Sequence, residues 1–193
     1  MSNAIPTDRR IMDAAQRLMQ VRGYNAFSYA DIAEEVGVRT ATIHYHFPSK
    51  GVLARDVVAR YRADTRAKLA AIHRETDDAR RKLERYVDLY GAILREGSRI
   101  CLCALLAAEL PTLPTGVHTE VRGYYVDHEA WLSRVLEDGV AAGALRIADP
   151  APITAQILLS GIDGAMLTAR AHGDPARFDA IASRLLNAIA PSA

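Results

Sequence analysis

Apolar residues recur at helical spacing along almost the whole chain, and this periodicity limits the possible folds more than any other feature of the sequence. In the first such segment Ile11, Ala14, Ala15 and Leu18 form one apolar stripe, and Gly23 follows as a typical helix end. No segment shows a sustained alternation of apolar and polar residues between hairpin turns. The sequence therefore predicts an all-α fold.

Capping residues and helix breakers predict where the helices begin and end. Ser28 is a typical N-cap, and Asp149-Pro150 and Asp174-Pro175 each place an acidic cap before a proline at the first helical position. On these signals and the apolar periodicity we expect helices over residues 7–22, 28–37, 39–47, 50–75, 79–95, 100–110, 117–142, 150–172 and 175–190.

Charge is distributed unevenly, although the formal net charge is only +1. Residues 1–68 hold 11 Lys and Arg against 7 Asp and Glu, whereas residues 69–193 hold 13 against 16. A basic head on an acidic body is typical of a nucleic-acid-binding module with a partner domain, and chance asymmetry is the alternative. The two short helices around Gly37-Val38 form a helix-turn-helix, so we expect a head over residues 1–49, a connecting helix over 50–75 and a larger helical body over 76–193.

The second helix of this motif carries side chains suited to DNA. A helix that enters a major groove needs small or hydrogen-bonding residues at its leading end and phosphate-binding groups around them. Arg39, Thr40 and Thr42 meet the first need, and the phosphate-binding candidates are His44, Tyr45, His46 and Lys50. The alternative is an ordinary solvated helix that is held by Ile43 and Phe47.

The same segment resembles a known family. The residues that carry the resemblance are Gly23-Tyr24, Phe27-Ser28, Ile32-Ala33, Gly37-Val38, Thr42-Ile43, Tyr45-His46-Phe47, Ser49-Lys50 and Leu53, and they are similar to the N-terminal domain of tetracycline-repressor (TetR) family transcription regulators. The resemblance implies an all-α homodimer that binds a palindromic operator in double-stranded DNA, most often as a repressor. It also implies that a small molecule bound in the C-terminal domain releases the DNA.

The resemblance assigns roles to individual residues. It implies that Arg39, Thr40 and Thr42 face bases and that Tyr45, His46 and Lys50 contact phosphates, and we add Ser28 and Tyr29 to the DNA-binding set. His44 departs from the family, which usually has tyrosine there. Because histidine titrates near neutrality, this departure predicts operator binding that depends on pH.

The body offers candidates for the small-molecule site and for the dimer interface. Tyr124, His128 and Trp131 lie four and three residues apart and therefore share one face of a helix. The candidate ligand-binding residues are Tyr86, Tyr90, Cys101, Tyr124, His128 and Trp131. The candidate dimer residues are Ile157, Gly161, Gly164 and Leu167, since glycine within a helix permits close approach of a second helix, either from a partner chain or from the same chain.

Other functions find less support in the sequence. It contains no glycine-rich phosphate loop and no metalloprotease or serine-hydrolase motif, so we expect neither an enzyme nor a cofactor. His44 and His46 are two positions apart on a helix and point to different sides of it, so they cannot bind one metal ion together. A helical protein-docking module is the remaining rival. Cys101 and Cys103 are either small core residues or, at Cys101, a sensor of oxidants or electrophiles.

The sequence also predicts where the protein works. The longest run without Asp, Glu, Lys or Arg covers the 13 residues from Pro150 to Ile162, which is shorter than a membrane span. The first residues show no apolar signal core, and two cysteines two positions apart form no disulfide framework. We therefore expect a cytoplasmic protein.

Overall fold

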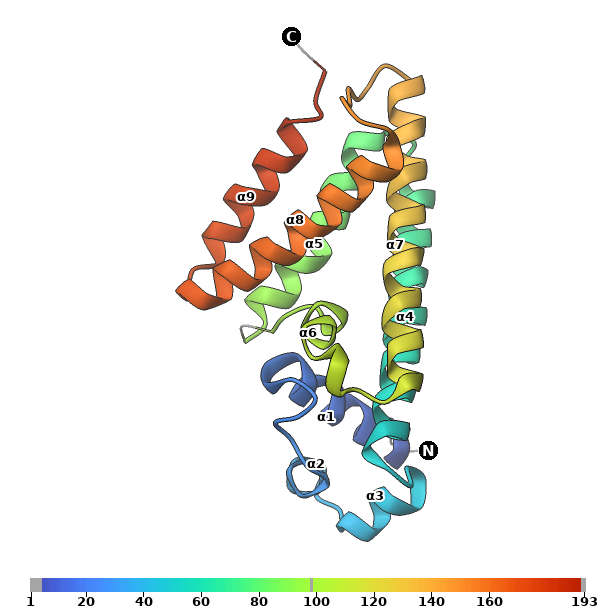
Figure 1. Ribbon diagram of the computed structural model, residues 1–193, viewed down its shortest axis with the longest axis vertical. Coiled ribbons are helices and arrows are strands. Elements are labelled where there is room, and N and C mark those ends of the chain that lie inside the picture. The colour runs from blue at the N-terminus through green and yellow to red at the C-terminus, as the bar shows by residue number, and fades with distance from the viewer. Residues whose placement is uncertain (1–4, 98, 192–193) are drawn as a thin grey trace. The chain divides into compact units, whose positions relative to one another are not determined.

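The computed structural model of the protein describes residues 5–97 and 99–191, and within these residues it contains helices and no strand (Figure 1). The helices are α1 (Thr7–Arg22), α2 (Tyr29–Val36), α3 (Thr40–His46), α4 (Lys50–Glu75), α5 (Ala79–Arg95), α6 (Leu102–Ala108), the short 3₁₀ helix η1 (Leu110–Thr112), α7 (Thr115–Ala141), α8 (Ala151–His172) and α9 (Pro175–Asn187). The predicted all-α fold is confirmed.

The cap predicted at Ser28 is present and shows why α2 begins there. The Ser28 side chain accepts a hydrogen bond from the backbone N–H of Asp31, and the Asp31 carboxylate accepts one from the backbone N–H of Ser28 at 2.7 Å. These two bonds satisfy N–H groups that the first turn of a helix leaves unpaired. At the other end Gly37 adopts a left-handed conformation with φ 73°, which glycine adopts without strain, and the turn to α3 follows.

Several predicted helix bounds differ from the structure, among them the start of α7 at Thr115 rather than 117 and the end of α9 at Asn187 rather than 190. The helix expected over residues 100–110 covers only Leu102–Ala108, and η1 replaces its end because Pro111 cannot continue an α-helix. The cap expected at Asp149 is wrong, since Pro150 occupies the N-cap position of α8 without a side-chain cap. The corresponding cap at Asp174 is confirmed, because its side chain accepts the backbone N–H of Ala176 at 3.0 Å.

The first of two compact units joins the described part of residues 1–63 with residues 102–123. Helix α1 packs against α2, α3 and α6 in this unit, and the buried side chains include Ile11, Met19, Ile32 and Ile43. The segment from α6 to the start of α7 therefore belongs with the N-terminal helices. This division differs from the expected domains at 1–49, 50–75 and 76–193, which were drawn along the chain.

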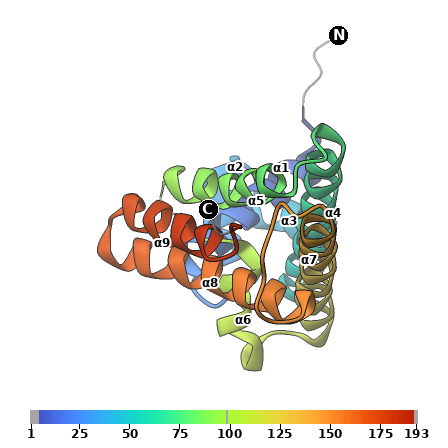
Figure 2. The same cartoon turned by 90° about the horizontal axis from the view of Figure 1, so that it is seen from above.

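The second compact unit joins residues 64–101 with the described residues from 124 onward. Helices α5, α8 and α9 pack together in it, and Figure 2 shows α8 and α9 side by side. Phe178 of α9 is fully buried, and a Cβ at Gly91 of α5 would lie 3.2 Å from its ring, so the glycine admits this ring. The chain passes between the units within α4, before α6 and within α7.

Candidate DNA-binding surface and buried polar cluster

Helix α3 has one buried side and one side open to solvent. Ile43 within the helix and Phe47 directly after it are buried in the first unit and fix the helix to its neighbours. Arg39, Thr40, His44, Tyr45 and His46 are exposed, and Thr42 is half-buried. Tyr45 is 84% exposed, which is unusual for a large aromatic side chain and leaves its ring and hydroxyl free to meet a partner.

Tyr29 and His44 support the end of α3. The Tyr29 hydroxyl donates a hydrogen bond to the backbone carbonyl of Phe47 at 2.9 Å, and the ring of His44 packs edge-on against the Tyr29 ring with centroids 4.7 Å apart. Burial raises the pKa of Tyr29 to about 12, so the hydroxyl keeps its proton and remains a donor. Ser28 is exposed beside this pair and serves as the cap of α2.

Lys50 is half-buried at the first residue of α4. Its Nζ donates a hydrogen bond to the backbone carbonyl of Phe27 and lies 4.6 Å from the ring centre of Tyr24 and 4.2 Å from that of Phe27. Burial lowers the pKa of Lys50, and the carboxylates of Glu109 and Asp31 oppose that shift. In the free protein the ammonium group therefore holds the loop between α1 and α2.

Glu109, which lies far along the chain from the helix-turn-helix, also holds this loop. Its carboxylate accepts the backbone N–H of Tyr24 at 2.5 Å. A Cβ at Gly23 would lie 2.5 Å from Glu109 Oε1, so the glycine is needed for this approach. Asn25 Nδ2 donates to Thr112 Oγ1 at 2.8 Å beside it. The segment after α6 is thus bonded to the loop that precedes α2, and no local pattern in the sequence signals this pairing.

A buried polar group in the second unit unites five of the six predicted ligand-binding residues. We call Tyr86, Tyr90, Cys101, Tyr124 and His128 the tyrosine cluster; each is at most 2% exposed. The Tyr90 hydroxyl is 2.6 Å from that of Tyr124 and 3.1 Å from that of Tyr86. His128 Nδ1 lies 3.1 Å from the Tyr86 hydroxyl, and Cys101 Sγ lies 3.3 Å from the Tyr124 hydroxyl. The spacing of four residues on α5 and on α7 brings these groups together.

The sixth predicted residue, Trp131, borders this cluster. Its ring stacks on that of Tyr86, with centroids 5.5 Å apart and planes inclined by 19°. Trp131 is only partly buried, and its Nε1 has no hydrogen-bond partner among the described residues. It therefore connects the buried cluster with the surface of the second unit.

Burial shifts the pKa values of His128, Tyr86 and Asp163, which all lie in this unit. It lowers the pKa of His128 to about 4 against the attraction of Asp127, and it raises that of Tyr86. Both side chains are therefore neutral at pH 7. Asp163 accepts a hydrogen bond from the Tyr125 hydroxyl at 3.0 Å, but its Oδ1 has no partner among the described residues, and burial raises its pKa to about 6.

These shifts predict how stability depends on pH. The pKa of Asp163 rises from 3.8 to about 6 on folding, so its contribution is fully present below pH 3.8 and is lost as pH rises through about 6. The pKa of His128 falls from 6.5 to about 4, so its contribution is lost as pH falls from 6.5 through about 4. We expect Asp163→Asn to raise the free energy of unfolding at pH 7.5 by up to about 3 kcal/mol and to leave it almost unchanged near pH 4.

Urea unfolding at pH 4, 6 and 7.5, at one fixed protein concentration, checks this expectation. Between pH 6.5 and 4 the two groups of the unmodified protein oppose each other, so Asp163→Asn should reveal the His128 effect as a steeper loss of stability with falling pH. An equal change in stability at all three values would contradict the assigned pKa of Asp163.

The predicted dimer residues occupy an exposed face of α8. Ile157 is 51% exposed and Leu167 is 43% exposed, and Ile153 on the same face is 46% exposed. A Cβ at Gly161 would lie 2.7 Å from Leu185 of α9, so this glycine admits a contact within the chain. A Cβ at Gly164 would meet no atom within 4 Å, which leaves room for a residue from outside the chain.

The N-terminal helices form a helix-turn-helix whose second helix is buried on one side and exposed on the other, and the rest of the described chain is helical. This combination is typical of a DNA-binding transcription regulator. The sequence profile described as "Bacterial regulatory proteins, tetR family" matches residues 11–57, and that of the "Tetracyclin repressor-like, C-terminal domain" matches residues 79–185. The chain therefore belongs to the tetR family. Regulators of this family bind operator DNA and small-molecule ligands and act as dimers.

Individual relatives agree with this assignment. The HTH-type transcriptional repressor KstR2 of Rhodococcus jostii is 30% identical over 142 residues, which cover 70% of this chain and 66% of that repressor, just under two thirds of its length. The crystal structure of a TetR-family transcriptional regulator from Agrobacterium tumefaciens is 40% identical, with a TM-score of 0.92, and the match covers 95% of this chain and 97% of that one. A regulator from Saccharomonospora viridis in complex with choline is 26% identical, with a TM-score of 0.81 and coverage of 96% and 98%.

None of the helices in the described parts of the chain combines the length and the apolar character needed to cross a membrane.

Proposed function

We propose that two copies of this chain bind a palindromic operator through paired α3 helices and repress transcription in the cytoplasm until a small molecule binds the second unit. The observation that carries the proposal is the outward face of α3, which is exposed while Ile43 and Phe47 anchor its opposite side. The resemblance to KstR2, which is named a repressor, favours repression, and the choline complex of the Saccharomonospora viridis regulator supports control by a ligand.

Each of the predicted DNA-binding residues has a role in this proposal. Arg39, Thr40 and Thr42 lie at the start of α3 and read bases, because the leading end of a recognition helix approaches the base edges. The phosphate contacts come from Ser28, Tyr29, His44, Tyr45, His46 and Lys50. Lys50 serves twice, since the same ammonium group that holds the Phe27 carbonyl carries two further donors for a phosphate oxygen.

The exposed face of α8 completes the proposal, because an operator palindrome requires a twofold dimer. Ile157, Gly164 and Leu167 contact the partner chain, and Gly161 shares this role with its contact to Leu185. Burying three large apolar side chains on α8, Ile153 included, would remove the largest exposed apolar residues of that helix from water.

Ligand binding reaches the DNA-binding unit through the chain itself. Cys101 belongs to the tyrosine cluster, and the next residue, Leu102, begins α6, which leads directly to Glu109 and its bond to the Tyr24 backbone. A ligand that rearranges the cluster therefore displaces the start of α6 and with it the support of the α1–α2 loop. The expected coupling is about 1–3 kcal/mol, and operator DNA must weaken ligand binding by the same factor.

Selection of DNA from a random library tests the proposed function. We expect the purified protein to enrich a palindrome whose half-sites lie about 34 Å apart, and binding to this palindrome should weaken steeply with salt. Enrichment of a site without twofold symmetry would contradict the paired arrangement. Failure to retain any duplex at low salt would overturn the assignment of α3 and favour a head that docks onto another protein.

A further inference from the structure

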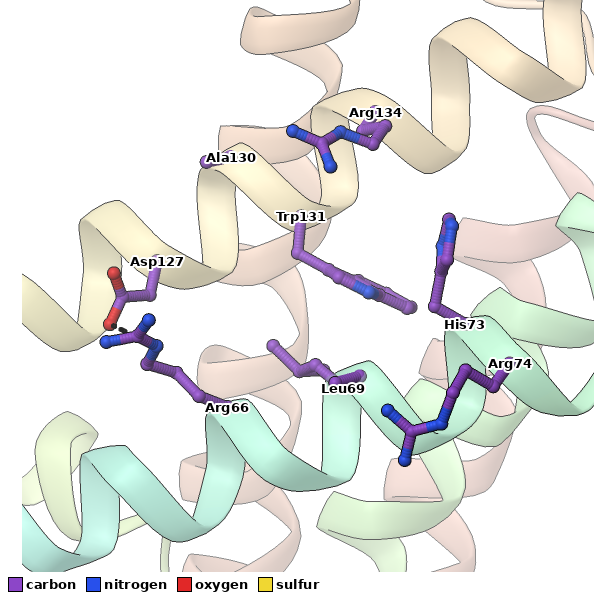
Figure 3. Close-up of a pocket in the computed structure, with 9 residues that line it drawn as sticks. Arg66, Leu69, His73, Arg74, Asp127, Ala130, Trp131 and Arg134 are labelled. Carbon is purple, nitrogen blue, oxygen red and sulfur yellow. Dashed lines mark ion pairs between the residues drawn. The ribbon is translucent and has the colours of Figure 1, made fainter.

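A pocket of about 460 Å³ lies in the second unit between the last turns of α4 and the middle of α7 (Figure 3). Its size falls within the range of about 300–1,000 Å³ that is usual for small-molecule sites. The pocket is open to solvent at its arginine side chains, and none of the arginines that line it was among the residues expected to bind a ligand.

Positive charge dominates this pocket. Its lining includes three arginines, Arg66, Arg74 and Arg134, and one carboxylate, that of Asp127. At one end of the pocket Asp127 Oδ2 lies 3.9 Å from Arg66 Nε, and a dashed line in Figure 3 marks this ion pair. Arg74 and Arg134 have no ion-pair or hydrogen-bond partner in the part of the chain that the structure describes, and Figure 3 shows them on opposite walls, one on α4 and one on α7. The two unpaired cations therefore favour an anion at the end away from Asp127.

The remaining wall suits a flat apolar group. Figure 3 shows the indole of Trp131 reaching from α7 toward α4, with the side chains of Leu69 and His73 beside it. One face of the indole is occupied by Tyr86, with ring centres 5.5 Å apart, so the indole is held in place. An aromatic ring in the pocket gains contact with this indole and with Leu69 without having to order either side chain first.

We propose that this pocket binds a small aromatic carboxylate, with its ring against Trp131 and Leu69 and its carboxylate between Arg74 and Arg134. Arginine is suited to this task because its planar guanidinium group donates two parallel hydrogen bonds to a carboxylate. A neutral aromatic compound leaves both guanidinium groups unused, and an aromatic cation is repelled by them. The proposal names a class of effector, and it rests on the proposed function only for the effect of binding on DNA.

Trp131 is the only tryptophan of the chain, so tryptophan fluorescence reports on the surroundings of this one side chain, which include the pocket and the adjoining Tyr86. The test titrates the full-length protein, without DNA, with benzoate, phenylacetate and 3-phenylpropionate, followed by fluorescence and by calorimetry. Benzyl alcohol and benzylamine are the neutral and cationic comparisons. We expect saturable binding of at least one acid, weaker binding of the alcohol and no binding of the amine.

Variants localise the bound acid. In Arg74→Gln/Arg134→Gln we expect the affinity for the acid to fall at least about tenfold, because two hydrogen bonds to charged groups are lost. Arg81→Gln, at an exposed arginine of α5 outside the pocket, is the matched control and should bind normally. If no acid binds saturably at millimolar concentrations, or if the double variant binds as tightly as the control, the site is not an anion pocket.

Operator DNA separates this site from the proposed function. If the acid releases the palindrome from the Arg81→Gln control but not from the Arg74→Gln/Arg134→Gln variant, the result supports an effector role. Binding of the acid without release of operator would overturn the effector role while the site itself stands. A protein that selects no operator but binds the acid would contradict the proposed function alone.

Discussion

Replacement of Ile157 and Leu167 by arginine is expected to convert the protein to a monomer and to weaken operator binding by about 10²–10⁴-fold. Both side chains are large, apolar and exposed on one face of α8, which is the proposed interface between two chains. Two arginines on each chain would bury four unpaired charges across a twofold axis, and each such charge costs several kcal/mol. A monomer holds one half-site only, so it loses the gain in affinity that comes from linking two contacts.

The measurements are the mass in solution by light scattering and the operator affinity of the same sample. Val126→Arg is the matched control, since Val126 is an apolar residue of α7 with 54% exposure that lies outside the face on α8. The control should remain dimeric and bind operator normally. A dimeric Ile157→Arg/Leu167→Arg protein with unchanged affinity would show that the chains pair through another surface.

Substitution of Arg39 by alanine should lower the affinity for the preferred operator by about 1–3 kcal/mol and relax the preference at one base pair of each half-site. Arg39 is exposed at the N-cap of α3, and its side chain makes no cap hydrogen bond, so its loss should leave the head folded. Tyr45→Ala should instead weaken binding to all sequences alike, because the proposed contact of Tyr45 is with phosphate.

Binding to the selected palindrome and to single-base variants of it distinguishes the two effects. Arg122→Ala removes an exposed arginine from α7 in the same compact unit and serves as the control for a simple loss of charge. If Arg39→Ala weakens all operators equally, Arg39 contacts phosphate and the base-reading role belongs elsewhere on α3.

Substitution of Tyr45 tests DNA binding more selectively than substitution of Lys50, although both residues are expected to contact phosphates. The Lys50 ammonium group bonds to the Phe27 carbonyl and lies over two aromatic rings, so Lys50→Ala disturbs the head as well as any contact to DNA. Tyr45 is 84% exposed and its removal leaves no buried gap. This difference arises from packing between residues that are 23 positions apart, which helical periodicity does not report.

The sequence alone was sufficient for the features that depend on near neighbours along the chain. The apolar periodicity indicated the helices. Ser28 and Asp31 marked the start of α2 and Gly37 marked its end, because a helix cap is formed by residues within one turn. The spacing of four residues likewise placed Tyr124 and His128 on one face of α7, where the structure has their ring centroids 4.0 Å apart.

Only the tertiary structure decided which distant residues meet. The carboxylate of Glu109 binds the backbone of Tyr24 across 85 positions, and Arg74 of α4 and Arg134 of α7 line the same pocket. Such pairs depend on how whole helices pack, and packing follows from the combined shape of many side chains. The sequence therefore determined the helices and the exposed face of α3, while the folded chain decided how the α1–α2 loop is held and where the cationic pocket lies.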